Sequence, residues 1–217
     1  MVNNAPSVYK SPSVYKTAGG GGVLPPQYTK LLYVRNKGNA WVKIDKAING
    51  LGVDAVIALN SYSSNNSVGF LANRGSSNDV LYISDTKNFS WNNASYSGSQ
   101  QLNASLYEQI FIKGRANGTN TVNVTVGYGV NTYSFSVAAA TYNRGNYIVL
   151  LRETDNPFAD SKRLDFYSSK IYDRTNELML DLVPCKNSSN EYGVFDFVDN
   201  LFYKFESQGD IIPGPEI

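Results

Sequence analysis

The sequence contains no histidine and a single cysteine, Cys185. Without histidine the chain cannot use Ser-His-Asp or Cys-His catalysis, histidine-ligated metals or an imidazole pH switch. One cysteine excludes an intramolecular disulfide, so the fold must depend on the burial of apolar side chains. Cys185 follows the apolar run Leu182, Val183 and Pro184, and we expect it to be a small buried side chain rather than a nucleophile.

Charge is also scarce, because charged residues make up only 17% of the chain and the net charge is +1. No global field therefore favours nucleic acid or an anionic membrane surface, and we expect neither as a partner. No apolar window is long enough to span a bilayer. The first residues do not combine a positive stretch with an apolar run, so we expect synthesis in the cytoplasm of the producing cell without a signal peptide.

The chain does contain many short apolar runs separated by Gly, Asn, Ser and Asp, at the spacing that is typical of a β-sandwich or barrel. Residues 121–126 alternate valine with polar side chains, which predicts a strand with one buried face, and residues 127–132 predict a hairpin turn. No long stretch has the helical period. Together with the C-terminal block, we predict about thirteen antiparallel strands in one domain over residues 23–217, with candidate strands at 31–34, 41–44, 55–59, 69–72, 80–84, 109–113, 122–128, 132–138, 147–152 and 165–172.

Both ends of this domain carry recognisable motifs. The C-terminal part reads KIYD at 170–173, DLVPCKN at 181–187, GVFDFVDNLFY at 193–203 and GPE at 214–216, and the N-terminal part reads LPPQYTKLLYV at 24–34 with Gly38, Trp41 and Val42. These residues resemble laminin-G-like, concanavalin A-like jelly-roll domains of tailed bacteriophages and gut bacteria. The sequence departs from the family at Leu32 and Lys43, where the family has acids. The resemblance implies a jelly-roll β-sandwich in a virion protein that is a head fibre, a capsid decoration or a tail-associated adhesin.

Residues 1–22 differ in character from the rest of the chain. The segment APSVYK at 5–10 is followed at once by SPSVYK at 11–16, and four glycines come before Val23. The prolines favour an extended or polyproline-like arm, in which both Val-Tyr pairs face the same way. A disordered leader is the alternative. We predict that the arm anchors the domain to a particle through capsid or other virion proteins, by the residues Pro6, Ser7, Val8, Tyr9, Lys10, Pro12, Ser13, Val14, Tyr15 and Lys16.

The longest turn-rich stretch, residues 89–99, contains one of only two tryptophans. A sugar ring can lie against an aromatic face while amides meet its hydroxyl groups. We therefore predict glycan contacts in this loop at Trp91, Asn92, Asn93 and Tyr96. The alternative is that Trp91 folds back to cap the edge of the sandwich or lies in a subunit contact.

Carboxylates gather at Glu153, Asp155, Asp160 and Asp165. Glu153 and Asp155 share a face if the backbone is extended, as a glycosidase pair would require, but Asn156 and Pro157 predict a turn directly after them. The same loop offers oxygen ligands for Ca²⁺, and solvated loop acids are the simpler interpretation. We predict no catalytic residue, no metal and no cofactor.

The sequence thus predicts a non-enzymatic bacteriophage structural protein on the virion surface, an all-β concanavalin A-like sandwich on an extended N-terminal arm. The lectin-like domain would display a surface for host or mucus glycans, and phage fibres suggest a homotrimer. A bacterial cell-surface or secreted carbohydrate-binding lectin module is the alternative, and a glycan hydrolase is the second alternative.

Overall fold

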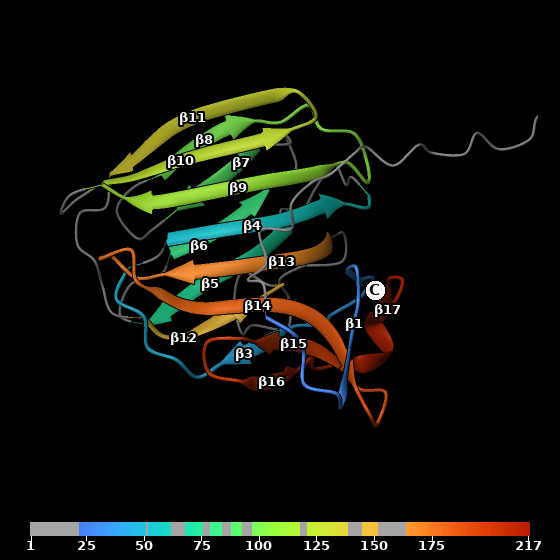
Figure 1. Ribbon diagram of the computed structural model, residues 1–217. Coiled ribbons are helices and arrows are strands. Elements are labelled where there is room, and N and C mark those ends of the chain that lie inside the picture. The colour runs from blue at the N-terminus through green and yellow to red at the C-terminus, as the bar shows by residue number, and fades with distance from the viewer. Residues whose placement is uncertain are drawn as a thin grey trace, which may run out of the picture.

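The computed structural model describes residues 22–50, 52–61, 68–75, 79–83, 88–92, 97–117, 121–138, 145–151 and 164–217. Within them the chain forms two antiparallel sheets that pack face to face, with the larger sheet in front in Figure 1. The predicted all-β jelly-roll sandwich is therefore confirmed, although the described residues form seventeen strands rather than about thirteen. The one helix of the described residues is a 3-10 turn at Gln208–Asp210.

The larger sheet has eleven strands, in the order β11-β10-β9-β4-β13-β14-β15-β16, with β1 paired to β14 and β2 paired to both β13 and β17. Its strands are β1 (Tyr28–Lys30), β2 (Val34–Asn36), β4 (Gly52–Leu59), β9 (Gln109–Ala116), β10 (Thr121–Tyr128), β11 (Asn131–Ala138), β13 (Leu164–Tyr172), β14 (Leu178–Asn187), β15 (Tyr192–Asp196), β16 (Leu201–Lys204) and β17 (Ile211–Pro213). Strand β4 thus lies between β9 and β13, which are distant in sequence.

The smaller sheet has six strands, in the order β3-β12-β5-β6-β7-β8. They are β3 (Val42–Ile44), β5 (Val68–Gly75), β6 (Asp79–Ile83), β7 (Asn88–Asn92), β8 (Ser97–Gln101) and β12 (Gly145–Leu150). The β7–β8 pair corrects the sequence-based prediction, which took residues 89–99 for a long loop.

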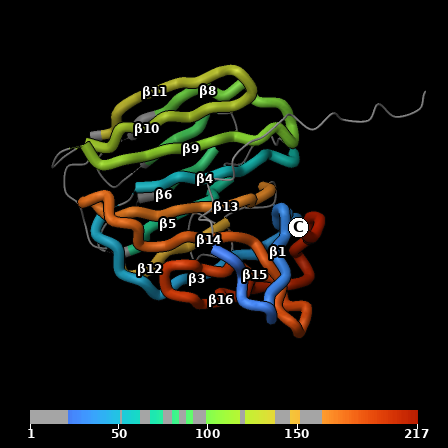
Figure 2. The backbone as a smooth tube through the Cα atoms, viewed as in Figure 1, coloured from blue at the N-terminus to red at the C-terminus, as the bar shows by residue number. Residues whose placement is uncertain are grey.

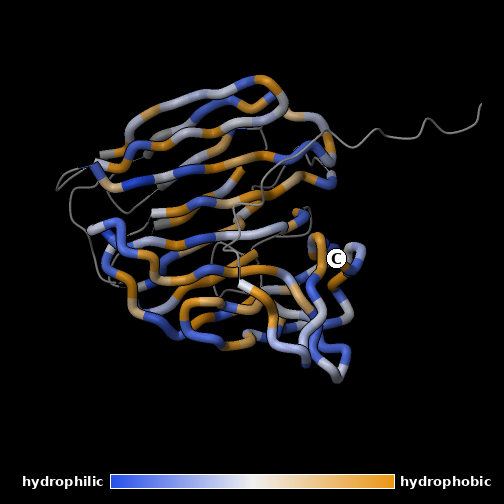
Figure 3. Tube along the Cα trace, in the orientation of Figure 1, coloured by the Kyte–Doolittle hydropathy of each residue, from blue (hydrophilic) through white to orange (hydrophobic). Residues whose placement is uncertain are grey.

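Side-chain alternation decides which face of the larger sheet is buried. On β10, Val122, Val124 and Val126 are buried, whereas Asn123 is exposed, as predicted. The alternation of apolar and polar positions is visible along the strands in Figure 3. The predicted hairpin is also present, since Tyr128 pairs with Asn131 across a two-residue turn that begins at Gly129, with φ 54°.

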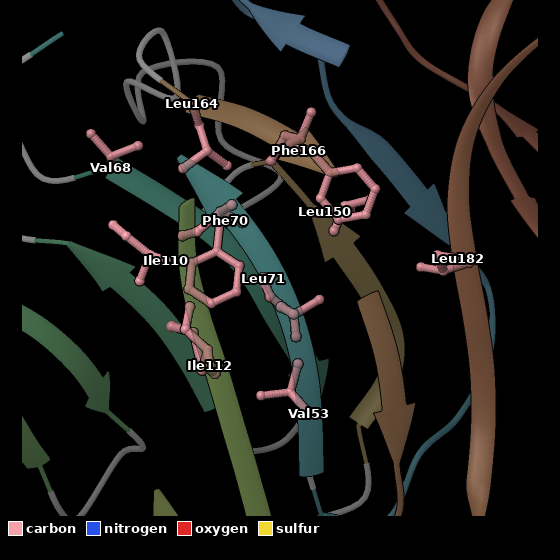
Figure 4. Packing of buried hydrophobic residues seen from close by; sticks show 14 of the residues in the cluster. Val53, Val68, Phe70, Leu71, Ile110, Ile112, Leu150, Leu164, Phe166 and Leu182 are labelled. Atoms are coloured by element: carbon pink, nitrogen blue, oxygen red, sulfur yellow. The ribbon is translucent and has the colours of Figure 1, made fainter. Parts of the chain in front are cut away.

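The core lies between the inner faces of the two sheets. Figure 4 shows Phe70 and Leu71 of β5 beside Ile110 and Ile112 of β9 and Val53 of β4. Apolar burial of this kind is the main source of stability in a chain without disulfides.

A second, smaller cluster lies on the outer side of the larger sheet. Cys185 is fully buried there with Val183 and Phe195, as predicted, and burial raises the pKa of its thiol to about 12. Tyr28 of β1 covers the cluster, with its ring stacked on Phe202 at 5.3 Å between centroids.

The first described residues and the end of the chain lie close together. Glu216 forms a bridge with Leu31, and the amide of Ile217 donates to the carbonyl of Lys30 at 3.1 Å. Figure 2 shows the C-terminus beside β1. The predicted single strand at 31–34 is accordingly wrong, because β1 and β2 pair with different partners on either side of Leu31.

The ring of Trp91 in β7 packs against Gly114 of β9, in the other sheet. A Cβ atom added to Gly114 of β9 would lie 2.2 Å from the Trp91 ring. Gly114→Ala should therefore lower the free energy of unfolding by about 2 kcal/mol through overpacking, as measured by urea denaturation. Gly209→Ala is the matched control, because its added Cβ meets no atom within 4 Å. Equal stability of the two variants would contradict the packing described here.

Candidate functional site

The outer face of the larger sheet presents polar and aromatic side chains, whereas its inner face is apolar. On β9, Ile110 and Ile112 point inward and are buried. The intervening positions face outward because successive side chains of a strand alternate, and they are Gln109, Phe111, Lys113 and Arg115.

A cavity of about 440 Å³ opens on this face over β4, β9, β10 and β11. Phe111 and Val56 are cross-strand partners and form its apolar part. Gly127 of β10 lies opposite Phe111 and has no side chain. The lining residues are Asp54, Ala55, Val56, Phe111, Ile112, Lys113, Thr125, Gly127, Tyr128, Gly129, Asn131 and Thr132.

The rim of the cavity is polar. Thr125, Asn131 and Thr132 contribute hydroxyl and amide groups, and the Thr125 hydroxyl also lies 3.1 Å from that of Ser134. Lys113 is exposed and forms no ion pair with a carboxylate of the described residues. The cavity thus combines an aromatic ring, neutral hydrogen-bonding groups and one ammonium group.

Asp54 forms one wall of the cavity, and its charge is compensated within the protein. Arg115 pairs with its Oδ2 atom, to which the Tyr172 hydroxyl donates at 3.2 Å. The Arg115 guanidinium also lies 3.6 Å from the Tyr172 ring centroid and donates to the carbonyls of Val53 and Gly114. Burial and the Asp54 charge raise the pKa of Tyr172, so this hydroxyl stays protonated. The wall is therefore rigid and nearly neutral.

A second polar cluster on the same face centres on Arg35 of β2. Its Nε and Nη2 atoms donate to the two carboxylate oxygens of Asp165, each at 2.7 Å, and Asn60 donates to the same carboxylate at 3.0 Å. Asp165 is only 1% exposed. The hydrogen bonds to Asp165 raise the pKa of Arg35, and such bidentate pairs fix the guanidinium plane.

Two tyrosine rings lie against this arginine, and a third packs on one of them. The Arg35 guanidinium carbon lies 4.9 Å from the ring centroid of Tyr107 and 5.5 Å from that of Tyr33. The rings of Tyr33 and Tyr167 lie 5.3 Å apart, and burial raises the pKa of Tyr167 to about 12. These residues place aromatic surface at one end of the outer face.

The structure corrects the predicted glycan contact at Trp91. Its side chain is 1% exposed and packs against Gly114 in the core, so it offers no surface to a ligand. Trp91 does not cap the edge of the sandwich either, because it lies within β7 with its ring in the core between the two sheets. Phe89 and Trp91 lie two positions apart, which is a strand signal that the surrounding Asn and Ser residues obscured. Asn92 ends β7, and Asn93 and Tyr96 lie outside the described residues.

Two other predicted groups also lie outside the described residues. They are the arm at 1–21 and the carboxylates Glu153, Asp155 and Asp160. Among the residues that are described, no three His, Cys, Asp or Glu side chains gather in a group that could hold a metal ion. In the same residues no helix has the length and apolarity that crossing a bilayer would require.

No protein-family model and no curated protein matches this sequence. Among solved structures, the chain is similar to a heptameric SAP-like pentraxin from Limulus polyphemus, with 12% identity, a TM-score of 0.45 and coverage of 69% of this chain and 78% of that one. It is also similar to a scytalido-glutamic peptidase bound to a peptide-based transition state analog, with 9% identity, a TM-score of 0.31 and coverage of 88% of both chains. A third is SCP-B, an eqolisin-family peptidase in complex with the tripeptide Ala-Ile-His, with 10% identity, a TM-score of 0.30 and coverage of 88% and 87%. Likeness at this level transfers no site to the present chain.

Loss of the ion pair between Arg35 and Asp165 should lower the stability of the fold. Asp165→Asn removes the charge that fixes Arg35, and leaves a part-buried cation without its partner. We expect a loss of about 2 kcal/mol in the free energy of unfolding, which is less than for a fully buried pair because the Arg35 side chain is 27% exposed. Asp45→Asn is the control, since its pair with Lys43 is exposed and should contribute almost nothing. Comparable losses in the two variants, measured by chemical denaturation, would refute this assignment.

Proposed function

We propose that this protein is a glycan-binding sandwich without catalytic activity, and that its ligand lies in the outer-face cavity. The observation that carries the proposal is the cavity of about 440 Å³, in which Phe111 and Val56 form the apolar part and Thr125, Asn131 and Thr132 form the polar rim. Trp91 has no part in the proposed site because it is buried.

The chemistry of the cavity suits a sugar. The apolar face of a pyranose ring can stack on Phe111, and its hydroxyl groups can exchange hydrogen bonds with Thr125, Asn131 and Thr132. The ammonium group of Lys113 adds a preference for a glycan that bears a carboxylate or sulfate group.

The described carboxylates of this face support binding rather than hydrolysis. A glycosidase needs one carboxylic acid and one carboxylate on either side of the scissile bond. Asp54 is held by Arg115, and Asp165 is held by Arg35 and Asn60. Both carboxylates are thus engaged in ion pairs and hydrogen bonds inside the protein and are not presented to a substrate as a pair.

We further propose that this domain is displayed on a bacteriophage particle, to which the arm at residues 1–22 attaches it. Support comes from the sequence: the doubled PSVYK segment presents the same side chains twice, and both ends of the domain resemble laminin-G-like phage domains. A bacterial surface lectin module is the alternative, which would use the same cavity with a different anchor.

Two substitutions in the cavity should weaken glycan binding in glycan-array screening. Phe111→Ala removes the stacking surface. Gly127→Leu fills the space beside it without a backbone clash, because an added Cβ would lie 3.5 Å from its nearest neighbour, the carbonyl oxygen of Asn131. We expect both to lose binding by about tenfold or more. The melting temperature should stay close to that of the unaltered protein in Gly127→Leu and should fall in Phe111→Ala, because the Phe111 ring is half-buried.

Val130→Ala is the control for the array, since Val130 lies fully exposed at the hairpin tip and should bind normally. Lys113→Gln should weaken binding to acidic glycans alone, and added salt should reduce the difference. The proposal fails if the unaltered protein binds no glycan, or if Phe111→Ala and Gly127→Leu both bind normally.

The anchoring role of the arm is tested by deleting residues 1–21. The cut leaves Gly22, which lies against Phe197, and should not disturb the domain, so the melting temperature should be unchanged. We expect immunoblots of purified virions to contain the full-length chain and to lack the truncated one. Incorporation of both chains to the same extent would show that the arm is not the anchor.

A further inference from the structure

Strand β11 lies at one edge of the larger sheet, at the top of Figure 1, and within the described residues it pairs only with β10. All eight of its residues pair with β10 in one unbroken register, and none of them is charged or a proline. Such an edge presents a row of backbone N–H and C=O groups to which another strand can add. Charges, prolines and bulges are the usual features that prevent this addition.

The other edge strands of the two sheets are shorter, and two of them carry a lysine. Strand β16, at the opposite edge of the larger sheet, has four residues and ends in Lys204, which pairs with Glu191. Strand β3 of the smaller sheet has three residues and contains Lys43, which pairs with Asp45. Strand β8 has five residues, one of which is a glycine. Among the described strands, β11 is therefore the longest edge and has none of these protective features.

The register with β10 decides which backbone groups of β11 face the open side. Asn131 pairs with Tyr128 across the two-residue turn, and a hydrogen bond between the first and last residue closes a turn of this kind. Since the backbone bonds of a strand alternate between its two sides, the odd-numbered residues of β11 bond to β10. The even-numbered residues direct their N–H and C=O groups to the open side, and they are Thr132, Ser134, Ser136 and Ala138.

Two aromatic rings of the core also reach this edge. Tyr133 and Phe135 point inward from β11 and pack against the core, but neither is fully buried. The Phe135 ring lies 6.2 Å from that of Phe89, and the Tyr133 ring lies 5.8 Å from that of Tyr128, between centroids. A strand added beside β11 would remove more of both rings from water, which would contribute apolar burial in addition to backbone hydrogen bonds.

A second copy of the chain is the partner that this edge fits. Antiparallel pairing has two-fold symmetry, so β11 can pair with β11 of another copy through the same groups on both sides. No like charges oppose this approach, and the uncharged strand offers no electrostatic attraction to a partner of opposite charge. We propose that two copies join edge to edge along β11, so that their larger sheets form one continuous sheet.

The register that uses the whole strand has its two-fold axis at Phe135. It sets Ser134 of each copy opposite Ser136 of the other, and it forms about eight backbone hydrogen bonds. The two Phe135 rings then lie next to each other at the axis. Because each copy uses the same edge, the contact closes at two copies and predicts a dimer, whereas the sequence analysis predicted a trimer. This inference does not depend on the proposed glycan function.

Sedimentation velocity of the full-length chain tests the proposal. The mass should rise with protein concentration from that of one chain, 23.9 kDa, to that of two. The double variant Ser134→Lys/Ser136→Lys sets like charges opposite each other in both cross-strand pairs, so its dissociation constant should increase about tenfold or more. Both serines are exposed in the single chain, and its fold should be unaffected.

Two further variants separate this contact from a general effect of charge. Ser188→Lys/Ser189→Lys introduces the same two changes at the exposed turn between β14 and β15, and it should dimerise normally. Ser134→Glu/Ser136→Glu alone should dimerise as poorly as the lysine variant at these positions. An equal mixture of the two should form a mixed dimer, because each cross-strand pair then joins opposite charges.

Four results would overturn the proposal. They are a mass of one chain at every concentration, a mass of three chains, normal dimerisation of Ser134→Lys/Ser136→Lys, and no association in the mixture of lysine and glutamate variants. Deletion of residues 1–21 should leave the dimer intact. Loss of the dimer on this deletion would assign the contact to the arm instead of β11.

Discussion

The contact between the inner faces of the two sheets is the interaction on which the rest of the molecule depends. A single cysteine provides no covalent link, so apolar packing is the main interaction that holds the layers together. The Trp91 ring occupies the space that Gly114 leaves on the opposite sheet, and so couples β7 to β9. The large inner side chains are committed to this contact, and the cavity lies instead on the outer face of the larger sheet.

The charged groups of that outer face are arranged by pairing inside the protein. Arg35 and Arg115 each hold an aspartate and each lie against tyrosine rings. Pairs of this kind add little net stability, because removing charges from water offsets much of their attraction. Their value here is rigidity, since a ligand that meets side chains already fixed in place loses less conformational entropy on binding.

Much of the fold could be predicted from local sequence pattern. The valine alternation of β10, the Gly129 turn and the succession of β13, β14 and β16 are all local signals, and each appears in the structure. Strands β7 and β8 escaped prediction because short strands rich in Asn and Ser resemble loops. Their membership in the sheet is decided by Phe89 and Trp91, whose burial depends on partners far along the chain.

The candidate site was harder to predict than the fold. Asp54 and Lys113 become neighbours only because β4 pairs with β9, 50 or more residues later. Gly127 contributes to the cavity only because the register of β9 and β10 places it opposite Phe111. The sequence analysis predicted that Trp91 is exposed, whereas its side chain is buried in the core.

The position of Gly22 relative to the cavity bears on how such a site would work on a surface. Gly22 lies against Phe197, just beyond β15, whereas the cavity lies over β9 and β10. Five strand spacings separate β15 from β10 in the sheet order, or about 24 Å. A domain tethered through its N-terminal segment would hold its groove at the far side from the tether. Many copies on one particle could then engage a glycan layer together, and individually weak contacts would add up to durable attachment through high effective concentration.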